Sequence, residues 1–339
     1  MNRIHSKFIL PSLLIVLAAV VFIVFMVFPQ NDSVATVNGV KIKADLYRYA
    51  LIMAKEEALA KHPDIKASDL WNYRSSENSP TYGNELEEYE LEKLINTALI
   101  NDRFRQLELT LTDAQNELRK KNLADRIEDL GGMDKAKQHF ARYYITYDDF
   151  AGFYEDYDRY ELLFLHYFGA DGEYPVNFNE IDAYYAENYA RIKSVFIPAD
   201  NNSAAENLAA QVENKAKEAE NDNFDALITQ YNKDKGMDSN PNGYIITKKY
   251  DDVAEYKDAA FAMQVGDIRT VLTDDGYYVM KKYSSTDPSV YTASDRQRAL
   301  LEMKSRDFYR LVSNDEAFSN VKRNEKLLEK IKIETITYK

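Results

Sequence analysis

The pattern of apolar and polar positions begins with one long apolar run near the N-terminus. Residues 8–28 read FILPSLLIVLAAVVFIVFMVF, and no charged residue occurs from position 8 through position 30. Because about 20 apolar residues cross a bilayer as a helix, this run predicts a transmembrane span. Arg3 and Lys7 precede the run and Asp32 follows it. By the positive-inside rule this asymmetry predicts a cytoplasmic N-terminus with the rest of the chain outside the cytoplasm.

A cleaved signal peptide is the alternative interpretation of the same run. Its apolar stretch is longer than the roughly 7–15 residues of a signal-peptide core, and the following FMVFPQND offers no small-x-small cleavage site. A retained anchor is therefore favoured. It predicts a single-pass protein of the cell (inner) membrane, anchored through its N-terminal helix, with its bulk extracytoplasmic or periplasmic.

The next region begins with a strand pattern and continues with helical periodicity. Val34–Ile42 alternates apolar and polar residues around Asn38-Gly39, a pair typical of tight hairpin turns. The segments that follow repeat apolar residues at i, i+3, i+4 and i+7, which predicts amphipathic helices. We expect these helices at Ala44–Lys61, Glu85–Leu107, from Thr112 to the Gly131-Gly132 break, Lys135–Tyr143, Tyr147–Phe168 and Phe178–Tyr189, with an irregular connection at 62–83.

A change of pattern near residue 190 predicts a second folded unit. Short β-branched and aromatic runs there alternate with short helical segments, in the order β-α-α-β-α-β-β. The expected strands are Arg191–Pro198, Tyr244–Thr247, Thr270–Thr273 and Tyr277–Lys282, and the expected helices are Ser203–Asn221, Phe224–Tyr231 and Glu255–Met263. Such an order favours helices packed on an antiparallel sheet.

The elements together predict an α+β fold with an N-terminal transmembrane helix. The expected divisions are a cytoplasmic stub and anchor at 1–30, an all-helical chaperone-like region at 31–189, the β-α-α-β-α-β-β domain at 190–285 and a helical segment at 286–339. The last segment regains helical periodicity and is expected to pack back on the first helical region.

Composition then excludes several classes of function. A net charge of -13 argues against a nucleic-acid partner, which needs clustered Lys and Arg. Cysteine is absent, which excludes disulfides, thiolate nucleophiles and Cys-based metal sites. The histidines are far apart in sequence, so a zinc site is not expected. They are His5, His62, His139 and His166.

Four stretches carry a resemblance to known families. EYKDAAFAMQVGDIRTVLTDDGYYVMKK at 255–282 and NFDALITQYNKD at 223–234 resemble the parvulin-type peptidyl-prolyl isomerase domain. ATVNGVKIKADLYR at 35–48 and LEKLINTALINDR at 91–103 resemble the N-terminal region of extracytoplasmic foldases related to SurA, PpiD and PrsA. The resemblance implies peptidyl-prolyl cis-trans isomerisation or chaperone activity without a cofactor, with unfolded or proline-containing exported polypeptides as partners.

The resemblance also points to candidate catalytic residues. Active parvulins carry a buried histidine on the first strand and another on the last, and those positions here are Ser194 and Tyr278. The family's Cys or Asp after the second helix corresponds to Asp234. Two hydroxyls can keep a hydrogen-bonded link across the site. The alternatives are that Ser194 and Tyr278 are ordinary strand residues of a decayed site and that Asp234 is a turn residue before Gly236.

Candidate substrate-binding residues follow in the same way. The family's proline-pocket positions correspond to Tyr244, Asp252 and Tyr256, and a carboxylate at 252 lines a prolyl ring poorly. Phe261 is a further candidate for this pocket, although a core position accounts for it equally well. Tyrosine side chains suit peptide binding because they offer a large contact area with a polar tip.

Two functions from different classes therefore remain open. The first is a membrane-anchored isomerase and foldase, which lowers the barrier of about 18–20 kcal/mol set by amide resonance by binding the twisted amide best. The second is a non-catalytic chaperone with a degenerate parvulin domain, which the missing histidines favour. A structural partner of the export machinery is a weaker third possibility.

Overall fold

The computed structural model describes residues 32–199, 203–218, 222–248, 253–318 and 320–339. The predicted anchor at 8–28 lies outside these residues. No helix in the described ranges is long and apolar enough to cross a bilayer. The predicted fold class is therefore corrected to a mixed α/β fold of a helical region and a parvulin-like domain, and the predicted placement as a single-pass inner-membrane protein is not supported.

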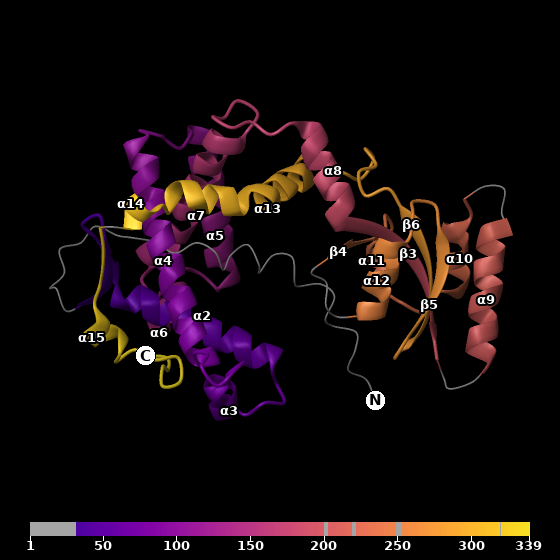
Figure 1. Cartoon of the computed structure of the whole chain (residues 1–339), viewed down its shortest axis with the longest axis horizontal. Helices are drawn as coiled ribbons and strands as arrows, with labels where there is room; N and C mark the ends of the chain where they lie inside the picture. Colours follow the sequence, from indigo (N-terminus) through magenta and orange to yellow (C-terminus); the bar gives the residue numbers. More distant parts are fainter. Residues whose placement is uncertain (1–31, 200–202, 219–221, 249–252, 319) are drawn as a thin grey trace. The chain divides into compact units, whose positions relative to one another are not determined.

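The chain divides into two compact units, and the second is inserted into the first. Of the described residues, those from 176 to 304 form the second unit, while the first combines those from 32 to 175 with those from 305 onward (Figure 1). The C-terminal segment from 305 onward thus folds with the helical region that precedes the insertion.

A small sheet in the first unit joins residues 33–43 to residues 321–323, far apart in the sequence. Strands β1 (Ser33–Val37) and β2 (Val40–Lys43) form the expected hairpin, and Asn38 and Gly39 both have positive φ, at 48° and 85°. Positive φ at both central residues matches the twist of a two-residue hairpin. Strand β7 (Val321–Arg323) pairs antiparallel with the free edge of β1, which gives the order β2-β1-β7. The sequence did not predict β7.

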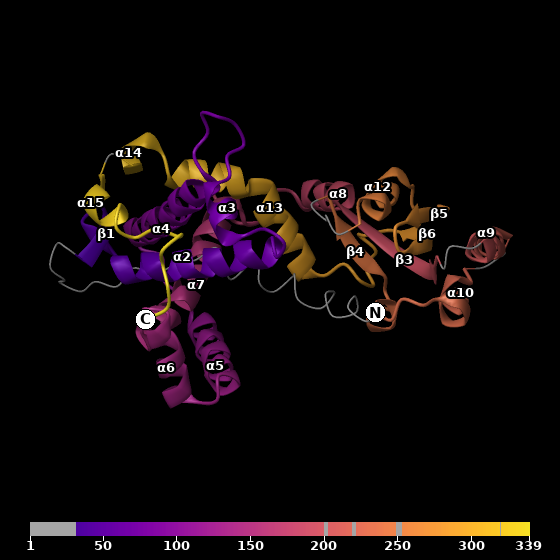
Figure 2. The same ribbon diagram turned by 90° about the horizontal axis from the view of Figure 1, so that it is seen from below.

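Helices pack around this sheet and bury a large core, and a second, smaller cluster lies around α3. Their bounds are α2 Ala44–Lys61, α3 Ala67–Asn72, α4 Tyr82–Gln106, α5 Asp113–Asp129, α6 Met133–Arg142, α7 Tyr147–Phe168, α14 Asp315–Phe318 and α15 Glu325–Leu328. The core includes Ile42, Leu46, Leu94 and Phe140. Helix α3 lies within the connection expected to be irregular. Figure 2 shows α5 and α6 as a pair that projects from the other helices of this unit.

Side-chain caps explain why two of these helices begin where the sequence predicts. Thr112 and Gln115 form a capping box at the start of α5, and Thr146 and Asp149 form another at the start of α7. Each box satisfies backbone donors that a helix start otherwise leaves unpaired. Lys43 on β2 also binds Asp149, with Nζ and Oδ1 2.7 Å apart, which ties the sheet to α7.

The second unit contains the expected four-stranded antiparallel sheet. Its strands run in the order β4-β3-β6-β5. Their bounds are β3 Tyr189–Pro198, β4 Tyr244–Thr247, β5 Ile268–Thr273 and β6 Gly276–Tyr283. The helices are α8 Phe178–Asn188, α9 Ser203–Glu218, α10 Phe224–Tyr231, α11 Gly236–Ser239, α12 Ala254–Ala262 and the start of α13 (Ala293–Val312), whose end lies in the first unit.

The central strand β3 supplies side chains to a core on each face of this sheet. Val195 and Ile197 pack with α9 and α10, whereas Ile192 packs with α12 and with Met280 of β6. Figure 1 shows α9 and α10 on one side of the sheet and α11 and α12 on the other. A strand that is covered on both faces usually has a nearly continuous apolar sequence. Residues 191–198, RIKSVFIP, match this pattern only in part, because Arg191, Lys193 and Ser194 are polar.

One buried charge in the first unit is incompletely compensated. Asp156 of α7 is fully buried, and its Oδ1 accepts a hydrogen bond of 2.7 Å from Asn101 Nδ2 of α4. Its Oδ2 has no partner within the described part of the chain. Burial raises the pKa of the Asp156 carboxyl well above its usual range, although the Asn101 hydrogen bond and the Arg159 guanidinium oppose this rise.

We predict that Asp156→Asn stabilises the protein at neutral pH. Since the folded state binds this proton more tightly than the unfolded state, the residue's contribution is most favourable at low pH and is lost as pH rises through the folded pKa. The neutral amide keeps an oxygen that accepts the hydrogen bond from Asn101, and it removes the buried charge. We expect the free energy of unfolding to rise by about 1–3 kcal/mol. Thermal unfolding of both proteins between pH 4 and pH 8 measures this.

The gain should shrink toward pH 4. Asp148→Asn is the control, since Asp148 is an exposed residue of the same helix and its change should have a small effect at every pH. Equal unfolding temperatures for Asp156→Asn and the wild type at pH 8 would contradict the prediction.

Candidate functional site

The candidate residues lie on the α12 face of the sheet in the second unit. In the antiparallel register of β3 and β6, Ser194 is opposite Met280 and Phe196 is opposite Tyr278. Because side chains alternate between faces along a strand, all four of these residues share one face. Ser194 and Tyr278 therefore lie on the same face of neighbouring strands, two register pairs apart.

The sequence suggested a hydrogen-bonded link between Ser194 and Tyr278, but the structure shows Ser194 bonded to Tyr256. Tyr256 of α12 donates its hydroxyl to Ser194 Oγ across 3.1 Å. Ser194 has an exposed fraction of 0% and Tyr256 one of 5%. This hydroxyl pair is consequently shielded from a peptide in solution, and it joins α12 to the centre of β3.

Tyr278 packs between the buried pair and the surface. Its ring meets the Tyr256 ring edge-on, with centroids 5.0 Å apart and an interplanar angle of 79°. The Tyr278 ring also packs against the Phe196 ring, and the centroids of these two rings are 4.7 Å apart. Both Phe196 and Tyr278 are partly exposed. They form an aromatic wall that a bound polypeptide can touch.

Asp234 and Tyr244 form the second polar pair of the site. The Tyr244 hydroxyl donates to Asp234 Oδ2 across 2.7 Å, and Oδ1 of the same carboxylate accepts from the Gly236 backbone N–H at 2.8 Å. Both side chains are partly exposed. Burial and the Asp234 carboxylate together raise the pKa of Tyr244, so its hydroxyl keeps its proton at physiological pH.

The two pairs converge on one region of the sheet. Tyr244, Tyr256 and Tyr278 pack in the same apolar cluster with buried residues of α12 and β3. The structure thus brings together five of the sequence candidates, which are Asp234, Ser194, Tyr278, Tyr244 and Tyr256.

The sixth candidate, Phe261, packs against the same core from the end of α12. Its ring is partly buried and lies 5.9 Å from the Nζ of Lys248 and 5.9 Å from that of Lys282. Asp252 lies outside the described residues. Sequence reasoning missed Phe196, although the alternation of side chains along β3 places it on the same face as Ser194.

The described ranges contain no group of three or more His, Asp or Glu side chains arranged to hold a metal ion. The chemistry available on this face is therefore that of a carboxylate, hydroxyls and aromatic rings. Such groups position and polarise an amide but offer no activated nucleophile.

Comparison with known families identifies this domain. Residues 184–285 match the model of the PPIC-type PPIase domain. The second unit is thus a parvulin-type domain, in agreement with the resemblance carried by residues 223–234 and 255–282. No curated protein matches the chain.

Several solved structures show a distant likeness over most of the chain. The foldase protein PrsA from Streptococcus pneumoniae is 15% identical with a TM-score of 0.36, and the match covers 77% of this chain and 97% of that one. A peptidylprolyl isomerase (PrsA) from Bacillus cereus is 17% identical with a TM-score of 0.30, covering 78% and 97%. SurA-like chaperones from Campylobacter jejuni are represented at 17% identity and a TM-score of 0.25, covering 88% and 97%. At these TM-scores the likenesses assign no activity to this chain.

We predict that Gly236→Ala breaks the contact between Tyr244 and Asp234. A Cβ at residue 236 would collide with the Tyr244 hydroxyl, and the end of the tyrosine side chain is what can move. The Asp234 carboxylate helps to raise the pKa of Tyr244, so loss of the contact between these two side chains should lower that pKa. NMR of 13Cζ-labelled tyrosine during an alkaline titration, with Tyr244→Phe to assign the signal, measures this change.

Ser239→Ala in the same short helix is the control and should leave the Tyr244 titration unchanged. A wild-type titration curve for Tyr244 in Gly236→Ala would show that the hydroxyl and the glycine are not in close contact.

Proposed function

We propose that this chain is a peptidyl-prolyl cis-trans isomerase and foldase that acts on unfolded, proline-containing exported polypeptides. The observation that carries the proposal is a partly exposed Asp234–Tyr244 pair beside the Phe196–Tyr278 wall, within a PPIC-type domain. The resemblance of 35–48 and 91–103 to extracytoplasmic foldases extends it to exported chains.

The physical argument concerns the charge on the rotating amide. Resonance in the planar amide places negative charge on the carbonyl oxygen, and this charge is reduced as the C–N bond twists. A fixed electron-rich group beside that oxygen disfavours the planar form more than the twisted one. Asp234, with its charge held against the Tyr244 hydroxyl, is such a group. Binding the twisted form better than the planar one accelerates rotation.

Ser194 and Tyr256 have a different role in this proposal. They are buried and bonded to each other, so they do not touch the polypeptide. The pair fixes α12 on the sheet and supports the Tyr278 ring. In this proposal a hydrogen-bonded Ser194–Tyr256 pair, in contact with Tyr278, stands where the resemblance implies a pair of histidines.

A protease-coupled isomerisation assay on a proline tetrapeptide tests the enzyme proposal. We expect Tyr244→Phe to lower kcat/KM by about 10-fold, since one hydrogen bond of about 1 kcal/mol or more orients the carboxylate. Asp234→Ala should lower it at least as much. The matched control is Tyr231→Phe, which removes a hydroxyl bonded to Lys215 near the other face of the sheet. A wild-type rate equal to the uncatalysed rate would exclude catalysis.

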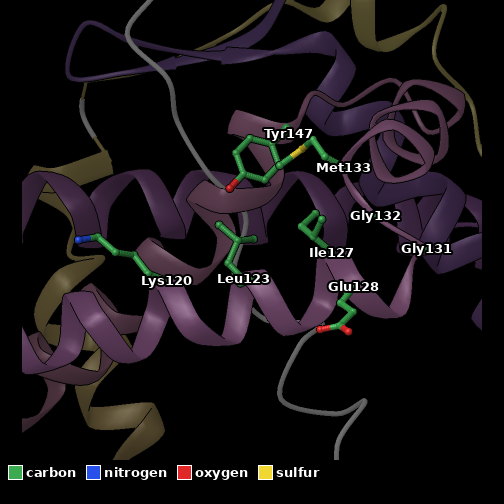
Figure 3. Close-up of a pocket in the computed structure, with 9 residues that line it drawn as sticks. Lys120, Leu123, Ile127, Glu128, Gly131, Gly132, Met133 and Tyr147 are labelled. Atoms are coloured by element: carbon green, nitrogen blue, oxygen red, sulfur yellow. The ribbon is translucent and has the colours of Figure 1, made fainter.

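The alternative, a chaperone without catalysis, is favoured by a cavity in the helical unit. The cavity measures about 490 Å³ and lies where α5, α6 and the start of α7 meet. Figure 3 shows Leu123 and Ile127 of α5 pointing toward Met133 and Tyr147 on the opposite wall. Its lining is mainly apolar, and the flexible thioether of Met133 adapts to ligands of different shape.

Such a cavity can hold apolar side chains of an unfolded polypeptide without reading its sequence. Transfer of apolar surface out of water supplies about 25 cal/mol per Å² and needs no specific polar contact. Holding clients in this way does not depend on the parvulin-type domain. The two functions can therefore be separated by variants in different units.

We predict that Ala124→Phe, which fills the cavity from α5, weakens suppression of aggregation of an unfolded model protein several-fold. The variant should leave tetrapeptide isomerisation unchanged because its position lies in the other unit. Ala114→Phe is the matched control, since Ala114 is an exposed residue of the same helix outside the cavity lining. Equal suppression by both variants would argue against client binding in the cavity.

A further inference from the structure

We propose that Asn232 is a positioning residue of this site, whose side-chain amide fixes the Asp234–Tyr244 pair relative to the Phe196–Tyr278 wall. The inference rests on the proposed function and adds a residue that lies in the resembling stretch 223–234 but was not among the site candidates. It begins with the edge of strand β3.

β4 covers only the first part of that edge. The pairing of β3 with β4 extends from Tyr189 to Ile192. Farther along, the loop after α10 is bonded to β3 at Phe196. The Phe196 backbone N–H donates to Asn232 Oδ1 at 2.8 Å, and the Lys233 backbone N–H donates to the Phe196 carbonyl at 3.0 Å. The loop therefore replaces a strand at this position.

The same side-chain amide also shapes the loop that carries Asp234. Asn232 Oδ1 accepts a second hydrogen bond, from the Asp234 backbone N–H at 3.1 Å. Asn232 Nδ2 donates to the Asp234 carbonyl at 2.6 Å. One planar group thus makes three hydrogen bonds, one to the strand and two to the backbone of Asp234.

These bonds connect the two halves of the site. The Phe196 ring packs on Tyr278, with centroids 4.7 Å apart, and the Asp234 carboxylate accepts from Tyr244. Asn232 holds the backbones of Phe196 and Asp234 at the same time. A displacement of its amide would shift the carboxylate relative to the aromatic wall.

The chemistry of asparagine accounts for its presence at this position. Three bonds of this kind need an acceptor with two lone pairs and a donor in one plane, which an amide supplies. Aspartate keeps the acceptor but has no N–H for the Asp234 carbonyl, and alanine has neither group. A site that favours a twisted amide depends on placement within about 0.5 Å, so loss of this amide should reduce turnover more than substrate binding.

The test uses Asn232→Ala in the full chain, with two independent readouts. In the isomerase assay we expect kcat to fall about 10-fold with KM nearly unchanged. The fall should disappear in the Tyr244→Phe background, because the amide acts through that pair. In 13Cζ-tyrosine NMR the Tyr244 and Tyr278 signals should both move. Asn242→Ala, an exposed residue of the turn before β4, is the control and should move neither signal.

A second variant keeps the inference testable if the alanine variant does not fold. Asn232→Asp retains the acceptor for Phe196 and loses the donor to the Asp234 carbonyl. It should therefore move the Tyr244 signal and leave the Tyr278 signal in place.

Two outcomes would overturn the inference. One is that Asn232→Ala, or Asn232→Asp in its place, leaves the Tyr244 signal where it is in the wild type. The other is that the kcat losses of Asn232→Ala and Tyr244→Phe multiply in the double variant. A wild-type protein without isomerase activity would exclude the proposed function instead, and the NMR readout would still decide whether Asn232 positions the site.

Discussion

Burial of strand β3 on both faces is the constraint on which the second unit depends. Its odd-numbered residues Val195 and Ile197 enter the α9–α10 core, and its even-numbered residues face α12. A polar residue on such a strand must find a hydrogen-bond partner inside the protein, because an unpaired buried polar group costs free energy. Ser194 satisfies this requirement with Tyr256 of α12. This bond adds to the apolar packing that holds α12 on the sheet, and Tyr256 in turn contacts the Tyr278 ring.

The polar groups of the site fall into two classes by exposure. Ser194 and Tyr256 are buried and serve the architecture, whereas Asp234 and Tyr244 are partly exposed and can meet a polypeptide. In each class a tyrosine donates its hydroxyl to a smaller oxygen acceptor. The fold thus places two tyrosine hydroxyls in polar connections on the α12 face of the sheet.

Local sequence patterns were sufficient to predict most of the helices and strands, but not the tertiary contacts between them. Asn38-Gly39 predicted the hairpin because the turn needs positive φ at both positions, and Thr112 predicted the start of α5 through its cap. Strand β7 was missed because three residues are too short to show a period, and only its pairing with β1 makes it a strand. The membrane placement predicted from 8–28 rested on the hydropathy of that run and on the residues that flank it, and no spanning helix occurs in the described ranges. The choice of Tyr256 as the partner of Ser194 needs a tertiary distance, which periodicity does not contain.

The three-stranded sheet of the first unit has a consequence for the order in which the chain folds. Its central strand comprises residues 33–37, and the strand that completes it, paired through Ala35 and Arg323, comes nearly 300 residues later in the chain. Contacts between residues close in sequence form faster than contacts between distant residues. Residues 176–304 can therefore fold while the edge of β1 that pairs with β7 is still unpaired. In a nascent chain that ends before residue 321, the inserted second unit could be folded while the first unit still lacked strand β7. The sheet that contains β1 is therefore completed only after the inserted unit has been synthesised.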